Sequence, residues 1–96
     1  MNLVVIGTGY VGLVTGVGFA SLGNHVSFID LDTEKISKLQ NKEVPFYEPG
    51  LEDHFQDTEV FSRMSFTSSY KDIDWDSTEV AFICVQTPNN LDTNSV

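Results

Sequence analysis

The first part of the chain alternates between short apolar runs and glycine-containing turns. Residues 3–6 form an apolar, β-rich run that stops at Gly7, as is typical of a strand buried on both faces. Residues 10–22 then carry helical spacing and are followed by Gly23, a residue that favours the C-terminal end of a helix. Residues 25–30 are again apolar and β-rich. The pattern predicts a strand, a helix and a second strand in close succession.

The remainder of the chain continues this alternation, with longer polar segments in between. Helical spacing predicts a helix at residues 33–41 and a shorter one at residues 51–56. Two prolines within five residues interrupt both periods between these helices and predict a loop. Strands are predicted at residues 63–67 and 79–85, with one weak helical turn between them. This element order favours a parallel α/β sheet with crossover helices, and the continuous apolar strands indicate cover on both faces.

Three glycines, Gly7, Gly9 and Gly12, stand between the first strand and the first helix. The spacing GxGxxG is a weak signal alone, but at a strand-to-helix turn each glycine has a physical role. Gly7 permits the tight turn, Gly9 lets a pyrophosphate approach the backbone, and Gly12 lets the helix pack close to the sheet. The N–H groups at the start of the helix favour a phosphate charge. The turn therefore predicts a Rossmann-like dinucleotide-binding fold.

Two further features support this interpretation. Gly12, Gly16 and Ala20 recur every fourth residue, so they form a stripe of small residues that suits close packing on a strand. Asp30 ends the second strand, where a carboxylate can accept hydrogen bonds from both adenosine ribose hydroxyls and repel a 2′-phosphate. We therefore predict NAD rather than NADP. Asp32 is the competing acid, but its position favours a cap of the next helix. The alternative interpretation, a plain glycine turn beside a solvated acid, leaves the joint spacing unexplained.

Composition excludes several classes of protein. The 96 residues suit one small domain, and 41% hydrophobic residues are ordinary for a folded chain. A net charge of −9, from 14 acidic and 5 basic residues, excludes a nucleic-acid interface, which needs a basic face. No apolar run has the length of a membrane helix, no basic leader precedes the first run, and the single cysteine forms no internal disulfide. We expect a cytoplasmic protein that contacts no membrane.

Four segments resemble the UDP-glucose 6-dehydrogenase family, which includes relatives acting on UDP-N-acetylmannosamine, UDP-N-acetylglucosamine and GDP-mannose. The segments are VIGTGYVGLVTGVGFASLGNHV, IDLDTEKISKL, PFYEPGLE and VQTP, in this order. The resemblance implies NAD as the cofactor. It also implies that Lys35 lies near the ribose and phosphate of the cofactor, and that Thr87 and Pro88, after the last strand, flank the cofactor. The residues that match the cofactor contacts of the family are Gly7, Gly9, Tyr10, Val11, Gly12, Asp30, Lys35, Thr87 and Pro88.

The resemblance also implies what the chain belongs to. Residues 1–96 match the NAD-binding part of an enzyme that oxidises the C6 hydroxyl of a UDP-sugar to a carboxylate with two NAD. We expect an incomplete domain, without the central helix and UDP-sugar-binding domain, and therefore no catalytic residue and no activity of its own. An open sheet edge after the last strand predicts a homodimer. The alternatives left open are an isolated non-catalytic dinucleotide-binding module and a dehydrogenase for another nucleotide sugar, such as UDP-N-acetylmannosamine or GDP-mannose, or for a hydroxyacid.

Other notable residues have structural interpretations. Cys84 lies inside a predicted buried strand, where a cysteine behaves as a small hydrophobe rather than a nucleophile. Glu48 precedes the predicted helix at 51–56, and a structural role at the helix entry is favoured over ligand contact. Phe46 and Tyr47 are expected to anchor the preceding loop. The two histidines lack the spacing of metal ligands, so no metal site is expected.

Overall fold

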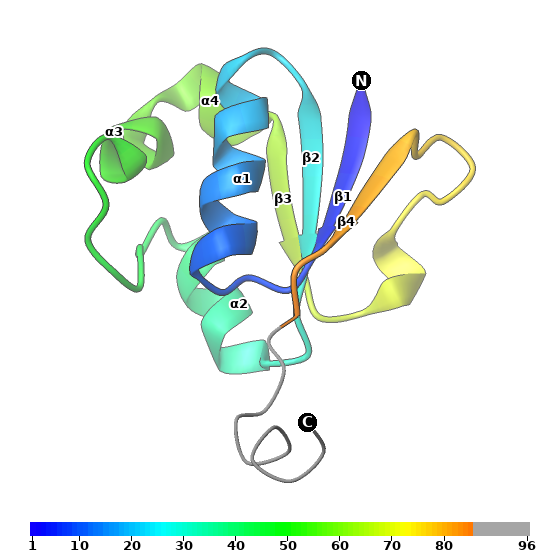
Figure 1. The fold of residues 1–96 in the computed structure, drawn as a ribbon. Coiled ribbons are helices and arrows are strands. Elements are labelled where there is room, and N and C mark those ends of the chain that lie inside the picture. The colour runs from blue at the N-terminus through cyan, green and yellow to red at the C-terminus, as the bar shows by residue number, and fades with distance from the viewer. Residues whose placement is uncertain (86–96) are drawn as a thin grey trace, which may run out of the picture.

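A computed structural model describes residues 1–85 of the chain and shows one parallel four-stranded sheet with helices packed against it (Figure 1). The strands are β1 (Asn2–Ile6), β2 (His25–Ile29), β3 (Met64–Thr67) and β4 (Val80–Ile83). Their order in the sheet is β3-β2-β1-β4, and every pairing is parallel. Strand β1 therefore lies inside the sheet, between β2 and β4. The predicted α/β class and its Rossmann-like topology are confirmed.

Four helices pack against one face of the sheet: α1 (Tyr10–Ser21), α2 (Thr33–Gln40), α3 (Leu51–Gln56) and α4 (Thr58–Ser62). The 3₁₀ turn η1 (Tyr70–Asp72) lies on the side of the opposite face. Helix α1 is the crossover from β1 to β2, and α2 begins the longer crossover from β2 to β3 (Figure 1). Within residues 1–85, none of the helices is both long enough and apolar enough to cross a bilayer.

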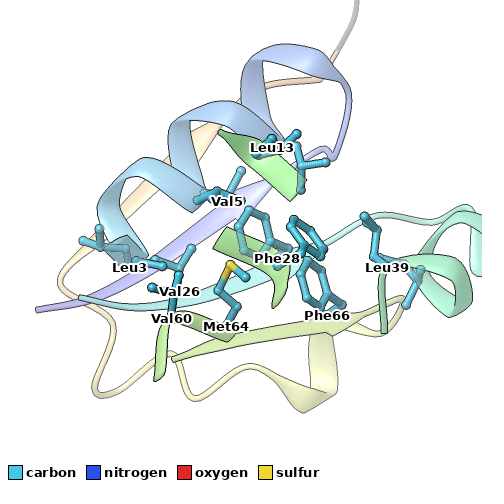
Figure 2. Close-up of a cluster of buried hydrophobic side chains, with 14 residues drawn as sticks. Leu3, Val5, Leu13, Val26, Phe28, Leu39, Val60, Met64 and Phe66 are labelled. Atoms are coloured by element: carbon cyan, nitrogen blue, oxygen red, sulfur yellow. The ribbon is translucent and has the colours of Figure 1, made fainter. Parts of the chain in front are cut away.

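Side chains of β1 point alternately to the two faces of the sheet and divide the core into two parts. Leu3 and Val5 lie in the larger cluster, which fills the space between the sheet and helices α1 to α4 (Figure 2). On the opposite face, Val4 packs with Ile29 and with Ile73, which follows η1. Because both faces of β1 and β2 are covered, these strands are continuous apolar runs, as predicted.

Small residues bring α1 close to the sheet. Gly12, Gly16 and Ala20 are all buried along one side of the helix. A Cβ placed on Gly16 would lie only 2.2 Å from the ring of Phe28, so the helix could not approach β2 this closely with alanine there. The helix ends before Gly23, whose φ of +106° suits glycine and whose N–H donates to the carbonyl of Ala20 (3.0 Å). The predicted packing stripe and helix end are confirmed.

Helix α4 was not predicted from the sequence. It is only five residues long, so hydrophobic periodicity cannot identify it. A cap stabilises its first turn, because Asp57 Oδ1 accepts hydrogen bonds from the backbone N–H groups of Glu59 (2.9 Å) and Val60 (3.2 Å). Val60 is buried in the larger cluster and Phe61 packs against it, so the cap and these core contacts hold this helix together.

Strand β4 is much more exposed than predicted. Val80 is 36% exposed and Ile83 is 74% exposed, and within β4 it is Phe82 that packs against the larger cluster, where it stacks on Phe19. The reason is that β4 forms an edge of the sheet, with β1 as its one pairing partner among residues 1–85. The expectation that the sheet is covered on both faces is therefore wrong at β4. The homodimer through this edge stays a prediction.

Candidate functional site

The carboxyl ends of β1, β2 and β4 meet at one edge of the sheet. There the chain leaves β1 at Gly7, whose N–H donates to the carbonyl of Ile29 in β2 (2.8 Å). On the other side of β1, the N–H of Cys84 donates to the carbonyl of Ile6 (2.7 Å). The chain continues from β1 to β2 on one side of β1, whereas β4 lies on the other side of β1. The carboxyl end of β1 is therefore the switch point, at which the strand order reverses. Ligands of open parallel sheets bind at such points.

A cavity of about 270 Å³ opens at this switch point. Its walls come from the loop between β1 and α1, the end of β2, the first turn of α2, η1 and the residues after β4. The polar and glycine residues that line it are Gly7, Thr8, Gly9, Asp30, Lys35 and Tyr70. The structure thus brings together four of the predicted cofactor contacts from three separate segments.

The three glycines of the loop have three different surroundings. Gly7 has a φ of +103°, and a Cβ there would lie 2.8 Å from the carbonyl oxygen of Cys84. A Cβ on Gly12 would lie 2.0 Å from the carbonyl oxygen of Gly7, so helix α1 packs directly on the turn. A Cβ on Gly9 would meet nothing within 4 Å among the described atoms. The structural roles predicted for Gly7 and Gly12 are confirmed, and Gly9 borders open space.

Helix α1 begins beside this open space without a side-chain cap. Gly9 is its N-cap residue, and the first N–H bonded within the helix is that of Leu13, which donates to the carbonyl of Gly9 (2.9 Å). No side chain in residues 1–85 caps this end, and the first turn holds no acidic residue. The N–H groups of the first turn and the helix dipole therefore favour an anion here. Tyr10 and Val11 are exposed in this turn, and their backbone contacts to a cofactor stay predictions.

Asp30 is held by donors from the glycine loop and from the segment that follows β2. Its Oδ2 accepts hydrogen bonds from the backbone N–H (2.9 Å) and the hydroxyl (2.7 Å) of Thr8, and its Oδ1 accepts one from the N–H of Asp32 (3.0 Å). Partial burial opposes ionisation of this carboxyl. The hydrogen bonds from Asp32 and Thr8, with the charge of Lys35, outweigh the burial, so the pKa of Asp30 lies below its ordinary value. Asp30 is therefore a carboxylate that lines the cavity.

Thr8 was not among the predicted site residues. It is 1% exposed, and both of its donors are directed at Asp30. A hydroxyl residue between two loop glycines, opposite a strand-end acid, was the one signal in the sequence that could have identified it. Its role depends on β1 and β2 lying side by side, which the sequence pattern alone does not show.

The contacts of Lys35 show that Asp30 and Asp32 have different roles, one at the cavity and one as a helix cap. Asp32 Oδ1 accepts a hydrogen bond from the backbone N–H of Lys35 (3.0 Å), so the side chain of Asp32 caps α2, as predicted. The ammonium group of Lys35 lies 3.8 Å from Asp30 Oδ2, and its side chain lines the cavity. The site therefore presents one carboxylate and one cation, the pair expected to face a ribose and its neighbouring phosphate.

A second cavity, of about 290 Å³, lies on the other side of the loop. Gly9, Cys84 and Val85 line both cavities, and Tyr10 and Val11 complete the second one. The two cavities therefore adjoin at Gly9, beside the start of α1. An elongated ligand that crosses Gly9 would reach into both.

Tyr10 connects the glycine loop to the segment before α3. Its hydroxyl donates to Glu48 Oε1 (2.5 Å), and its ring lies 5.2 Å from that of Phe46, between centroids. The hydrogen bond, slight desolvation and the negative charge of Glu48 raise the pKa of Tyr10 above its ordinary value of 10.0. These contacts support the structural role favoured for Glu48 and confirm Phe46 as a loop anchor. Tyr47 is 89% exposed, so the expectation that it anchors the loop is wrong.

Replacing Tyr10 with phenylalanine is expected to loosen the loop at residues 44–50 and leave the sheet unchanged. The variant keeps the ring contact with Phe46 but removes the hydroxyl that donates a hydrogen bond to Glu48. Amide hydrogen exchange in residues 44–50 should become several-fold faster. Tyr47→Phe is the matched control and should show no change, because that side chain is exposed. Equal exchange in both variants would show that the hydrogen bond does not hold the loop.

The remaining predicted residues have mixed outcomes. Cys84 follows β4 rather than lying inside it, and it is half-buried at the cavity wall, so its predicted place in a buried strand is wrong. Thr87 and Pro88, the last two predicted cofactor contacts, lie outside the described residues. Within residues 1–85, no group of three or more histidine, cysteine or acidic side chains is arranged to hold a metal ion.

The residues around the two cavities fit the adenosine and diphosphate parts of a dinucleotide. The open space at Gly9 leaves room for a diphosphate beside the uncapped start of α1. Asp30 offers a carboxylate for ribose hydroxyls, and Lys35 supplies a positive charge nearby. Leu31 and Tyr70 give the outer part of the first cavity an apolar wall of the kind that suits a purine base.

Comparisons with known proteins agree with this geometry. The NAD-binding domain of the UDP-glucose/GDP-mannose dehydrogenase family matches residues 1–95. The chain is 42% identical to the UDP-glucose 6-dehydrogenase YwqF of Bacillus subtilis over 96% of this chain and 21% of that protein. It is 47% identical to the UDP-glucose 6-dehydrogenase of Pseudomonas aeruginosa over 92% of this chain and 19% of that protein.

Solved structures give the same result. The crystal structure of a GDP-mannose dehydrogenase from Pseudomonas aeruginosa superposes with a TM-score of 0.81 at 35% identity, over 92% of this chain and 20% of that one. The chain thus spans about a fifth of the length of these relatives. The match covers both the glycine loop and strand β2, which Asp30 follows. The chain therefore belongs to the UDP-glucose/GDP-mannose dehydrogenase family, of which it forms the NAD-binding domain.

Proposed function

We propose that this domain binds NAD with the diphosphate across Gly9 and the adenosine ribose at Asp30. The observation that carries the proposal is the ionised Asp30 carboxylate lining the same cavity as the open loop position at Gly9. The carboxylate favours ribose hydroxyls and repels a 2′-phosphate, so NAD is preferred over NADP. The nicotinamide half then extends into the second cavity, beside Tyr10 and Val11.

We further propose that the protein to which this domain belongs is a UDP-glucose 6-dehydrogenase. Such an enzyme oxidises the C6 hydroxyl of the sugar to a carboxylate, and bound NAD supplies the hydride acceptor. The support for UDP-glucose is that two relatives that are 42% and 47% identical to the chain are UDP-glucose 6-dehydrogenases. The contribution of these residues is to bind the cofactor and orient it.

Replacing Gly9 with alanine tests the cofactor site without disturbing the fold. The added methyl group would enter the open space and not the protein, because no atom of residues 1–85 beyond its immediate chain neighbours lies within 4 Å of it. We expect the free energy of unfolding to change by no more than about 1 kcal/mol, the scale of an N-cap substitution. NADH affinity should fall about tenfold or more, because the methyl group occupies the diphosphate position, and tenfold is about 1.4 kcal/mol. Calorimetric titration and urea unfolding measure the two effects.

Gly18→Ala is the matched control, since a Cβ at Gly18 on α1 also meets nothing within 4 Å in the described part of the chain but lies away from both cavities. It should leave NADH affinity unchanged. Unaltered NADH affinity in Gly9→Ala would exclude a diphosphate over this loop, and an unmodified chain that binds no NADH would overturn the proposal altogether.

A further inference from the structure

Thr8 is a buried polar residue at the edge of the proposed NAD site. It is 1% exposed, and burial of a hydroxyl is unfavourable unless the group is hydrogen-bonded. Its hydroxyl and its backbone N–H both donate to the same oxygen, Oδ2 of Asp30. A carboxylate oxygen has about two acceptor positions, so Thr8 occupies those of Oδ2.

The other oxygen of Asp30 is only partly used. Oδ1 accepts one hydrogen bond, from the backbone N–H of Asp32, which leaves one acceptor position for a ligand. The carboxylate therefore has one oxygen fixed to the loop and one free to meet the cavity. The expectation that the carboxylate accepts hydrogen bonds from both ribose hydroxyls therefore stays a prediction.

We propose that Thr8 is a positioning residue that turns Oδ1 of Asp30 toward the adenosine ribose and thereby sets the preference for NAD over NADP. The inference rests on the proposed function, because the ribose is the ligand that Oδ1 meets. Thr8 acts through Asp30 and touches no reacting atom. The loop that approaches the diphosphate also holds the carboxylate that selects the ribose, so one segment fixes both contacts.

Thr8→Val removes the hydroxyl while keeping nearly the same buried shape, and the backbone N–H of residue 8 remains. Thr8→Ser restores a hydroxyl and loses only a methyl group. Thr15→Val is the matched control, because it makes the same change on α1, in a residue that lines neither cavity of the site. Calorimetric titration of the 96-residue chain with NADH and with NADPH measures affinity and preference together.

We expect Thr8→Val to weaken NADH binding about 3- to 10-fold. This is less than the full effect of one hydrogen bond to a charged group, because the backbone N–H of residue 8 still donates to Asp30. NADPH binding should change less, so the ratio of the two affinities falls. Thr8→Ser should remain within about twofold of the unmodified chain, and Thr15→Val should match it.

A second measurement separates positioning from mere support of the fold. The charged and titratable groups around Asp30 are Lys35 and Asp32 on its own side and the Tyr70 phenol across the cavity. Loss of the Thr8 hydroxyl removes a donor to the ionised form, so the pKa of Asp30 should rise in Thr8→Val and return in Thr8→Ser. Carbon NMR of the Asp30 carboxyl follows this titration, and the acid limit of NADH binding should move with it.

Each outcome decides the question. Weaker NADH binding in Thr8→Val, with an unchanged affinity ratio and an unchanged Asp30 titration, would make Thr8 a purely structural residue. Unchanged NADH and NADPH affinities in Thr8→Val would overturn the inference and leave the proposed function intact. An unmodified chain that binds no NADH would overturn both.

Discussion

Replacing Gly12 with alanine is expected to lower the free energy of unfolding by about 3 kcal/mol or more, the upper range for overpacking a tight contact. The new methyl carbon would lie 2.0 Å from the carbonyl oxygen of Gly7 and 3.2 Å from the Cβ of Cys84. The closest obstacle is backbone, which cannot rotate away as a side chain can. Helix α1 would have to move off the sheet, and a small domain has only about 5–15 kcal/mol of stability in total.

Gly18→Ala is the control for this expected loss, because it makes the same change in the same helix. A Cβ there meets no tertiary neighbour within 4 Å among residues 1–85, so only helix propensity changes, and alanine favours the helix by up to about 1 kcal/mol. Urea unfolding followed by circular dichroism should therefore show shifts of opposite sign. If both variants are stabilised alike, α1 does not pack against the turn at Gly7 as the structure shows.

Replacing Asp30 with asparagine is expected to abolish the preference between cofactors. An amide has one oxygen, so it cannot accept hydrogen bonds from both Thr8 and Asp32 as the carboxylate does. NADH affinity should fall about 10- to 100-fold, since hydrogen bonds to a charged group contribute about 1.5–3 kcal/mol. NADPH should lose little, because the negative charge that repels its 2′-phosphate is gone. Paired calorimetric titrations give the ratio.

Asp32→Asn is the control for this change, since it alters the neighbouring acid and keeps an oxygen that can cap α2. It should leave the cofactor preference intact. Equal affinities for NADH and NADPH in the unmodified chain would refute the assignment of Asp30 as the ribose acid.

The effect of Asp30→Asn on the free energy of unfolding is expected to depend on pH, in a direction that follows from the lowered pKa of Asp30. A carboxyl with a depressed folded-state pKa stabilises the fold fully above its ordinary value of 3.8, and this contribution disappears as the pH falls through the lower folded-state value. The difference in unfolding free energy between the unmodified chain and Asp30→Asn should thus be constant near neutral pH. It should shrink in acid, which urea unfolding at a series of pH values measures.

The first half of the fold was predictable because local signals agree there. The apolar run before Gly7, the helical spacing of the next segment and Gly23 at its end all indicate the same elements. Helix α4 was missed because its stability comes from the Asp57 cap and the buried Val60, not from a periodic pattern. Strand β4 was placed correctly, but its exposure was not, because an apolar run does not show how many neighbours a strand has.

The candidate site was predictable in part for the same reason. Gly7, Gly9 and Asp30 lie around one cavity, as their places at strand ends and in the first strand-to-helix turn indicate. Lys35, which only the family resemblance indicated, lines the same cavity. Thr8 was missed because a threonine acquires its role only when a carboxylate from another strand is placed opposite it. Spacing along the chain shows which residues follow a strand, and only the paired strands show which side chains face each other.

The position of β1 between β2 and β4 has a consequence for how the loop at Gly7 behaves. Amide exchange and local opening begin at sheet margins, where one row of backbone groups has no partner strand. The glycine turn instead follows β1, which is paired on both sides. Hydrogen bonds from Gly7 to Ile29 and from Cys84 to Ile6 hold its carboxyl end. The turn is thus tied to both neighbouring strands, and the Thr8 hydroxyl adds a hydrogen bond to Asp30, so we expect slower amide exchange in the turn than at the outer strands β3 and β4.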